Sequence, residues 1–506
     1  MSGPQPRRTG RWREALAGVA AAAVAAGLGE LAAAVAAPES GPVVVVGAAL
    51  VDLAPPWAKD AAIGLFGTAD KLALIGGILL VLLAVSGAAG VLEARRPPWG
   101  RVVFIALGVV GAVAAATRSG AGPLAVLPSL VAGAAGALAV TLLVRRLPEP
   151  DQNRRRFLAW AGGSAALGLL AALAGTALQT GRRAVQALRD AVVLPRPTTT
   201  AIIPAGAALD VDGLTPLITP NADFYRIDTA LRVPEIDPSG WRLRIHGLVA
   251  REVTITWDEL LALPLAESTT TLACVSNEVG GSLIGTAVWL GHPIRELLAR
   301  AEPTAEADMV LSRSIDGFTA STPLAVLQDD RDAILAVGMN GEPLPLEHGF
   351  PVRMVVPGLY GYVSATKWVT ELEVTRFDEA SAYWTDRGWS ERGPVKLSSR
   401  IDVPRRGQAL TAGRIVVAGV AWHQHVGIAA VDVQIDDGPW RPARLATAIS
   451  ADTWVQWRYD WADASAGSHT LRVRATSADG EVQTAVEQGV VPDGATGLHT
   501  VDVEVG

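Results

Sequence analysis

The sequence predicts three structural regions within its 506 residues: an α-helical membrane region, a mixed α/β domain and a C-terminal all-β domain. Two observations lead to this prediction. Residues 15–178 contain long stretches with almost no charge, although 18% of the whole chain is charged. Residues 210–506 have the composition of a soluble protein, and their pattern becomes entirely strand-like from about residue 397. A single soluble domain is therefore excluded.

The overall composition narrows the class of protein further. Half of the residues are hydrophobic, which excludes a disordered chain. The chain has one cysteine, so no internal disulfide can form. The formal net charge of −7 is not that of a nucleic-acid-binding protein, and no nucleic-acid partner is expected.

Five segments are apolar enough to cross a bilayer, and they define a predicted membrane domain over residues 1–180. They are residues 15–37, 71–92, 101–117, 123–144 and 157–178. A further apolar run, 41–54, is too short to span and ends in Pro-Pro-Trp. We interpret it as an interfacial or re-entrant piece.

Arginines gather in alternate loops of this region, which predicts its orientation. They precede the first span and lie between the second and third spans and between the fourth and fifth. By the positive-inside rule the N-terminus is then cytoplasmic, and everything after about residue 180 is extracytoplasmic. Residues 153–158 (NRRRFL) resemble a twin-arginine export signal; the alternative is an ordinary positive-inside stop for the last span. Both interpretations predict a multi-pass protein of the cell membrane, anchored in lipid.

A linker and a mixed α/β domain are predicted next, over residues 181–214 and 215–380. In the linker, Pro195, Pro197 and Pro204 discourage regular structure. Predicted strands in the domain are 241–249, 252–257, 308–314, 332–340, 350–358 and 369–377. Asp258 is predicted to cap a helix over DELLAL, and residues 289–301 are predicted to form another helix.

The last predicted domain, residues 395–506, contains short alternating strands separated by turn residues. The predicted strands are 413–422, 429–436, 454–461, 469–477 and 482–488. Several short strands in about 110 residues predict an immunoglobulin-like β-sandwich.

Cys274 is the residue most suggestive of chemistry. A lone cysteine is commonly a small buried hydrophobic residue. Here, however, it follows a polar Ser/Thr run and opens a loop with Asn277, Gly280 and Gly281. One thiolate with no nearby His or Cys cannot build a structural zinc site, so a bound metal must bring its other ligands. Molybdenum held by the dithiolene sulfurs of a pterin does so.

Several strings, in order along residues 215–506, resemble the sulfite oxidase family of molybdopterin enzymes. They are Pro220–Arg226, Thr271–Asn277, Trp289–Gly291, Ala336–Pro345, His348–Gly358 and Lys367–Trp368, followed by Gly419–Trp422 and Asp437–Trp440 in the all-β domain. The resemblance implies a sulfite-oxidase-like molybdopterin domain and a C-terminal domain of the dimerisation type. A homodimer through the C-terminal domain is therefore expected.

The resemblance also implies a set of site residues. Cys274 ligates the metal, and Cys274, Arg226 and Lys367 act in catalysis. The residues expected to bind molybdenum-molybdopterin are Asn221, Tyr225, Cys274, Asn277, His348, Arg353, Ser364, Thr366 and Lys367. Simpler interpretations are a surface ion pair for Arg353, a solvated side chain for Lys367 and a turn histidine for His348.

Haem is not expected in this chain, because all seven histidines follow residue 195 and none lies in a predicted span. Electrons are therefore expected to pass to a separate carrier, either a cytochrome or a quinone-linked protein.

Three departures from the family pattern leave the substrate open. Glu278 and Val279 stand where sulfite oxidases carry arginines that hold an anion. The expected active-site tyrosine before the last domain is missing near Gly393-Pro394, and the histidines of Trp422–His425 either face the substrate or belong to a solvated loop. Sulfite, a sulfoxide or another small oxo-donor or oxo-acceptor remains possible as substrate.

Two other classes of function remain open. One is a catalytically silent scaffold that acts as a membrane-tethered binding module, and the other is a transporter with an extracytoplasmic sensor domain.

Overall fold

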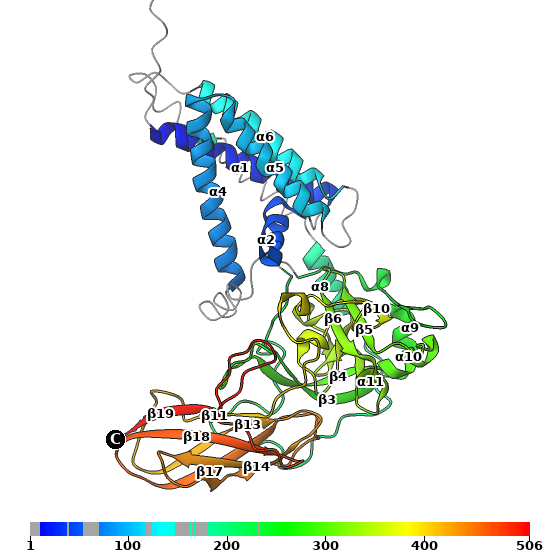
Figure 1. Cartoon of the computed structure of the whole chain (residues 1–506), viewed down its shortest axis with the longest axis vertical. Helices are drawn as coiled ribbons and strands as arrows, with labels where there is room; N and C mark the ends of the chain where they lie inside the picture. The colour runs from blue at the N-terminus through cyan, green and yellow to red at the C-terminus, as the bar shows by residue number, and fades with distance from the viewer. Residues whose placement is uncertain are drawn as a thin grey trace, which may run out of the picture. The chain divides into compact units, whose positions relative to one another are not determined.

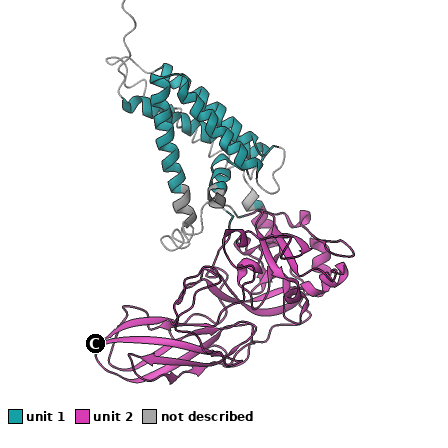
Figure 2. Cartoon of the chain, viewed as in Figure 1, with its two compact units in different colours: residues 1–184, 229–233 teal, residues 185–228, 234–506 magenta. Residues whose placement is uncertain are grey.

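The computed structural model describes residues 11–37, 40–53, 70–117, 124–146, 162–163, 166, 181–230 and 233–506. The chain divides into two compact units, which Figure 2 shows in different colours. Unit 1 comprises residues 1–184 and 229–233, and unit 2 comprises residues 185–228 and 234–506. The described part of unit 1 is mainly helical, and unit 2 contains the strands.

The main helices of unit 1 can be followed in Figure 1. They are α1 (Arg11–Ala36), α2 (Pro42–Leu53), α4 (Asp70–Arg95), α5 (Trp99–Ala116) and α6 (Leu127–Arg145). All except α2, which has 12 residues, are long and apolar enough to cross a membrane. They match the first four predicted spans. Almost all of the fifth predicted span, 157–178, and the arginine motif at 153–158 lie outside the described residues.

Close helix contacts in unit 1 depend on small residues and ion pairs. A Cβ atom on Gly108 would lie 2.8 Å from the Cα of Gly133, so α5 and α6 approach too closely for larger side chains there. Such contacts are typical of membrane helices, whose association depends on van der Waals packing. The buried carboxylate of Glu14 pairs with Arg95 at 2.9 Å and joins one end of α1 to α4.

Helix α8 (Gly181–Ala191) lies within the predicted linker, so the prediction of irregular structure was wrong for this stretch. The sequence GRRAVQALRDA has helical periodicity, and the prolines that discourage helix begin only at Pro195. Arg189 anchors the end of the helix: it donates to the Leu344 carbonyl at 2.9 Å and pairs with Glu342 at 3.0 Å.

Two five-stranded sheets form the α/β part of unit 2. The first has the order β2 (Val253–Thr256), β1 (Arg242–Gly247), β10 (Val369–Thr375), β5 (Met309–Ser314) and β6 (Thr319–Pro323). The second has the order β3 (Ala266–Ala273), β4 (Ile284–Pro293), β7 (Ile334–Met339) and β8 (Glu342–Pro343), with β9 (Arg353–Val355) paired to β7. Because Cys274 follows β3 and Arg353 opens β9, the second sheet carries both residues.

The predicted strands of this part are confirmed, but two helix boundaries differ from prediction. Helix α9 (Trp257–Ala262) is capped by Thr256 rather than Asp258: the Thr256 side chain and Glu259 form a reciprocal capping box. Residues 289–293 continue β4 because they pair with β7, so α10 begins only at Ile294 and ends at Ala301. A third helix, α11, spans Leu324–Gln328.

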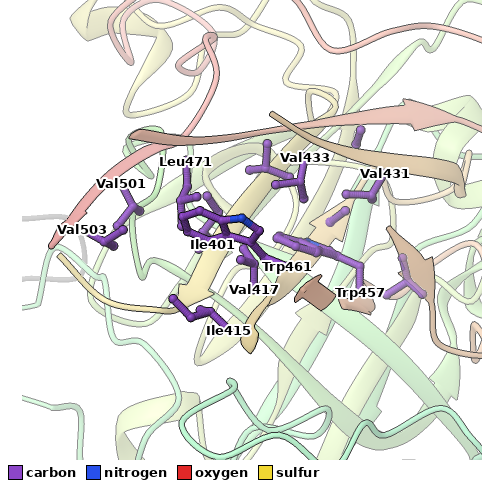
Figure 3. Packing of buried hydrophobic residues seen from close by; sticks show 14 of the residues in the cluster. Ile401, Ile415, Val417, Val431, Val433, Trp457, Trp461, Leu471, Val501 and Val503 are labelled. Carbon is purple, nitrogen blue, oxygen red and sulfur yellow. The ribbon is translucent and has the colours of Figure 1, made fainter. Parts of the chain in front are cut away.

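The C-terminal part of unit 2 contains two further sheets. One has the order β11 (Ser398–Val403), β13 (Gly413–Trp422), β17 (Val455–Ala464) and β16 (Arg444–Leu445). The other has the order β12 (Ala409–Leu410), β19 (Thr500–Val505), β18 (Gly467–Ser477), β14 (Ile428–Ile435) and β15 (Arg441–Pro442). Both sheets contribute to one buried core, in which Val417 and Trp457 of the first meet Val433, Leu471 and Val501 of the second (Figure 3).

The predicted strand at 482–488 was wrong. This segment makes isolated bridges at Val482 and Gln488 only, and the last strand is β19. The valines that suggested a strand are exposed, while Gln483 points inward and its side-chain oxygen accepts from the Ser399 hydroxyl at 2.7 Å. A buried amide among exposed valines reverses the pattern on which the prediction rested.

Hydrogen bonds join the C-terminal sheets to strand β3. The Trp454 backbone N–H donates to the Thr271 hydroxyl at 2.8 Å, and its indole N–H donates to the Leu217 carbonyl at 2.8 Å. Thr271 also donates its backbone N–H to the Asp452 carbonyl at 3.0 Å. The C-terminal part therefore supports the strand that leads to Cys274.

Candidate functional site

The loop from Cys274 to Leu283 connects β3 to β4 and is closed by three hydrogen bonds. The Cys274 N–H donates to the Leu283 carbonyl at 2.9 Å, and the Asn277 N–H donates to the Cys274 carbonyl at 3.1 Å. The Leu283 N–H donates to the side-chain oxygen of Asn277 at 2.8 Å. Asn277, predicted to bind the cofactor, therefore uses its oxygen to hold this loop.

The Cys274 thiol is buried and free of any disulfide. Burial raises its pKa, against hydrogen bonds from Ser276 and Val275 that lower it. The thiol is therefore protonated at neutral pH and unreactive as a free nucleophile, whereas a coordinated thiol loses its proton. These surroundings fit a metal ligand better than a nucleophile.

Two phenols lie close enough to Cys274 to interact with its charge. Burial raises the pKa of Tyr225, and Cys274, when it is ionised, raises it further. Burial likewise raises the pKa of Tyr360 to about 12, with a smaller contribution from Cys274. Gly361 lies nearby, because a Cβ atom there would be 3.7 Å from the Ala273 carbonyl and 3.9 Å from the Tyr225 hydroxyl. Both phenols keep their protons at neutral pH.

Arg353 is a buried cation without a carboxylate partner among the residues that the structure describes. It is 5% exposed, and its guanidinium donates to the carbonyls of His348 at 3.1 Å and Ala365 at 3.4 Å. It lies over the Trp289 ring, 5.0 Å from the centroid. Burial lowers its pKa to about 10. A buried charge that bonds only neutral acceptors is costly unless an anion joins it, so this position favours anion binding.

His348 and Asn221 bind each other beside this cation. The Nε2 atom of His348 lies 3.2 Å from the Asn221 carbonyl oxygen, to which it donates. The Asn221 side chain accepts from Asn340 at 2.8 Å and donates to the Glu342 carboxylate. Burial lowers the pKa of His348 to about 3, and the charge of Arg353 adds to this, so the imidazole is neutral.

Lys367 and Arg226 share one buried carboxylate, Asp228. The Lys367 ammonium lies 2.6 Å and the Arg226 Nε lies 2.9 Å from the same Asp228 oxygen. Burial lowers the pKa of Lys367 to about 8, against the charge of Asp228. The Lys367 ammonium also donates to the Glu347 carbonyl at 3.1 Å, next to the His348 carbonyl that accepts from Arg353, so this ion cluster lies beside Arg353. Asp228 was not among the predicted site residues, although it lies two residues after Arg226.

Ser364 and Thr366 are fully buried, and their hydroxyls are bonded within the protein. The Ser364 hydroxyl donates to the Tyr360 carbonyl at 2.9 Å. The Thr366 hydroxyl lies 2.7 Å from that of Ser312. Both side chains were predicted to contact the cofactor, and in the structure they support the segment between β9 and β10.

The donor set fits one kind of metal group. Among the described residues, no group of three or more His, Cys, Asp or Glu could hold a metal ion. Cys274 can supply one soft thiolate, and Arg353 can bind an anion through its planar guanidinium. Molybdenum carried by a pterin needs one protein thiolate, and the pterin phosphate needs a cation. The residues present therefore fit molybdenum-molybdopterin.

Comparisons with known proteins agree with this donor set. Residues 230–384 match the family described as Oxidoreductase molybdopterin binding domain. Human mitochondrial sulfite oxidase is 30% identical over 309 residues, covering 52% of this chain and 56% of that protein. The uncharacterized oxidoreductase YuiH of Bacillus subtilis is 33% identical over 160 residues, covering 31% of this chain and 76% of that protein. The chain belongs to the sulfite oxidase family.

As a sulfite oxidase family member, the protein is a molybdenum-dependent oxidoreductase with a molybdenum-molybdopterin cofactor. Its structure also resembles the sulfane dehydrogenase SoxCD of Paracoccus pantotrophus, with a TM-score of 0.50 and 25% identity over 57% of this chain and 81% of that one. The chain spans little more than half, 56%, of the length of the human enzyme. Family membership thus defines the cofactor, but it does not define the substrate or the direction of oxygen transfer.

This chain lacks the tyrosine that the sulfite oxidase family pattern places near Gly393-Pro394, but Tyr360, from elsewhere in the chain, lies beside that position. The Tyr360 N–H donates to the Gly393 carbonyl at 2.7 Å, and Leu359 forms a β-bridge with Pro394. Sequence reasoning missed Tyr360, although it closely follows the family string that ends at Gly358.

The loop Trp422–His425 binds within the C-terminal part and to β3. His425 lies 3.0 Å from the Asp452 carboxylate, with its side chain 36% exposed. The Gln424 amide donates to the Thr271 carbonyl at 3.4 Å. These contacts favour the loop interpretation over substrate binding.

Replacing Gly280 by alanine should reduce the molybdenum content of the protein by about fivefold or more. Gly280 has φ +78° and packs against His499, and a Cβ atom there would lie 3.0 Å from the ring Cγ and overlap other ring atoms. The substitution therefore combines a left-handed backbone penalty of about 1 kcal/mol with a clash that displaces the Cys274 loop. Elemental analysis of the purified variant measures the effect.

Gly480→Ala is the matched control, since Gly480 has φ +93° and no heavy atom within 4 Å of an added Cβ. Equal molybdenum loss in both variants would mean that backbone strain alone, and not contact with His499, explains the result.

Acid should destabilise the protein through His499. The Ile401 N–H donates to His499 Nδ1 at 3.0 Å, and burial lowers the pKa of the imidazole to about 4. An unfolded histidine titrates near ~6.5, so between ~6.5 and 4 the unfolded chain binds more protons. Stability should therefore fall as pH falls, by up to ~1.4 kcal/mol per pH unit.

Thermal unfolding at pH 7 and pH 5 should show a larger loss of stability in wild type than in His499→Asn, whose side-chain amide keeps an acceptor for the Ile401 N–H. Equal losses would assign the acid sensitivity to other groups.

Proposed function

We propose that this protein is a membrane-anchored, extracytoplasmic molybdenum oxidoreductase that moves an oxygen atom to or from a small substrate. The proposal depends on one observation: the buried thiol of Cys274 and the buried guanidinium of Arg353 lie around the same aromatic group. The Tyr225 hydroxyl and the carbonyl of Ala273, which precedes Cys274, both lie close to Gly361. The Tyr225 ring stacks on Phe224, whose ring contacts the Trp289 ring over which Arg353 lies. A soft metal ligand and an anion site thus adjoin the same aromatic group. Sulfite-type oxidation and sulfoxide-type reduction are the two reactions that this site can serve.

In this proposal each part of the site has one task. Cys274 ligates molybdenum, while Arg353, Asn221 and neutral His348 hold the pterin and its phosphate. When bound, molybdenum-molybdopterin supplies two-electron oxygen-atom transfer. Tyr225 and Tyr360, which burial keeps protonated, donate hydrogen bonds beside the thiolate. Arg226 and Lys367 provide positive potential that attracts a developing negative charge.

Anchoring and orientation are part of the proposal. Four helices are long and apolar enough to span a bilayer. Arginines in alternate loops support a cytoplasmic N-terminus, which would leave residues after about 180 outside the cytoplasm. The NRRRFL motif at 153–158 supports export of a folded, cofactor-loaded unit.

The domain boundaries and partners are also proposed. We assign a linker at 181–214, a molybdopterin domain at 215–380 and an immunoglobulin-like sandwich at 395–506, through which two copies dimerise. After each two-electron reaction the electrons leave singly to a separate carrier, either a cytochrome or a quinone-linked protein. The similarity to sulfite oxidases and to a sulfane dehydrogenase supports a redox partner of this kind.

Metal analysis of the purified full chain tests the proposal. It should contain about one molybdenum and one pterin per chain. Sulfite should reduce the metal if the enzyme is an oxidase, and sulfoxides or N-oxides should reoxidise chemically reduced metal if it is a reductase. A chain without molybdenum or pterin would instead be a silent scaffold on a membrane anchor.

A further inference from the structure

A hollow of about 680 Å³ adjoins the Cys274 loop within unit 2. Its wall includes Glu278 and Val279, which follow Cys274 by four and five residues. The rest of the wall comes from Ile401 and residues 404–406, and from residues 487–490 and 495–501 of the C-terminal part. This volume lies within the roughly 300–1,000 Å³ typical of small-molecule sites.

The hollow carries both signs of charge. Arg405 and Arg406 contribute two guanidiniums, and Glu278 and Glu487 contribute two carboxylates. Among the described residues, none of these four forms an ion pair with another; Arg406 makes only a long contact of 3.7 Å, to Asp502. All four residues are exposed to solvent, so two positive and two negative side chains line the same open hollow without pairing with each other.

The remaining wall offers apolar surface and a neutral imidazole. Val279, Ile401 and Leu498 supply aliphatic side chains. The Nδ1 atom of His499 is occupied as an acceptor, which places its hydrogen on Nε2, and the ring carries no charge at neutral pH. These uncharged residues favour neither an anionic nor a cationic ligand.

We propose that this hollow binds a small zwitterion, an aliphatic ammonium that also carries a carboxylate or sulfonate. Glu278 and Glu487 would repel a simple anion, and Arg405 and Arg406 would repel a simple cation. A ligand with both groups satisfies both pairs, and its short chain covers the aliphatic wall. The inference deepens the proposed function, because it takes the hollow as the place where the substrate's non-reacting end is held.

Isothermal titration of the purified full chain with four probes of similar size tests the inference. Taurine and β-alanine carry both charges, ethanesulfonate lacks the ammonium and ethylamine lacks the anion. At least one zwitterion should bind at least ~10-fold more tightly than both single-charge probes. Equal binding of ethanesulfonate would make the hollow an anion site, and no saturable binding by any probe would show that it is not a site; either result overturns the inference.

Substitutions of residues that line the hollow test whether the zwitterion binds there. Glu278→Gln and Arg405→Gln should each weaken zwitterion binding about 10-fold. Arg414→Gln is the matched control, because Arg414 is 70% exposed, pairs with Asp460 at 3.5 Å and does not line the hollow. Unchanged affinity in both hollow variants would contradict the inference.

The same titration in Cys274→Ser separates the two proposals. Zwitterion binding should persist in this variant, because the hollow does not include the thiol. Binding without molybdenum in the wild-type chain would refute the proposed function and keep the binding site, whereas molybdenum without binding would do the reverse.

Discussion

Replacing Cys274 by serine is expected to remove molybdenum from the protein and to lower oxygen-atom transfer by at least about 10³-fold, which corresponds to ~4 kcal/mol of activation free energy. A hydroxyl is a harder and weaker ligand for a soft metal than a thiolate. Cys274 is the one cysteine of the chain, so no other protein thiolate can take its place, and the described residues contain no group of three or more His, Cys, Asp or Glu that could hold a metal ion. Elemental analysis and substrate-linked turnover measure the two effects.

The fold should survive this change. Cys274 is 8% exposed, and the three hydrogen bonds that close its loop use backbone groups and the Asn277 side chain, not the thiol. Thermal unfolding of the metal-free forms of Cys274→Ser and wild type should therefore agree within a few degrees. A variant that kept its full molybdenum would show that the metal is held elsewhere.

A stability control completes this test. Val417 is fully buried in the C-terminal core, so Val417→Ala should lower the free energy of unfolding by roughly 1–3 kcal/mol. Because Val417 lies far along the chain from the loop and packs with the C-terminal sheets, the variant should keep its molybdenum. Loss of metal in both variants would indicate that general destabilisation, rather than a lost ligand, is responsible.

Local patterns predicted much of the architecture. The four described helices that are long and apolar enough to cross a membrane follow from uninterrupted apolar runs, and most strands follow from alternation within short segments. Errors arose where contacts distant in sequence override the local pattern. Residues 289–293 extend a strand because β7 pairs with them, and Gln483 turns inward because Ser399 binds its amide.

The candidate site shows the same limit. Cys274 and Arg353 could be selected from their strings, because a cysteine in a polar loop and an arginine in an apolar strand are locally unusual. Asp228 could not, since its partner Lys367 lies 139 residues away. His499 could not be linked to the Cys274 loop for the same reason: only the fold brings its ring against Gly280.

Replacing Arg353 by methionine is expected to lower the pterin and molybdenum content at least ~100-fold while leaving the metal-free protein as stable as wild type, or more so. The guanidinium is buried against carbonyl groups and the Trp289 ring, with no carboxylate partner in the described part of the chain. In the metal-free protein, burying this charge away from water destabilises the fold, and an apolar side chain of similar length removes that destabilisation. In the loaded protein the same charge provides charge-assisted hydrogen bonds to the phosphate, each worth roughly 1.5–3 kcal/mol.

The two effects have opposite signs, so a structural role and a binding role can be distinguished. If Arg353 only stabilised the segment around His348 and Ala365, the methionine variant would be less stable without metal, and that instability would cause the loss of cofactor.

Arg353→Lys should give an intermediate cofactor content, because lysine keeps the charge without the planar guanidinium. Arg313→Met is the matched control: Arg313 is 37% exposed and pairs with Glu371 at 2.9 Å, so its loss should leave cofactor content unchanged. A stable Arg353→Met protein with full cofactor would show that other groups hold the anion, such as the cations of the Lys367–Asp228–Arg226 cluster.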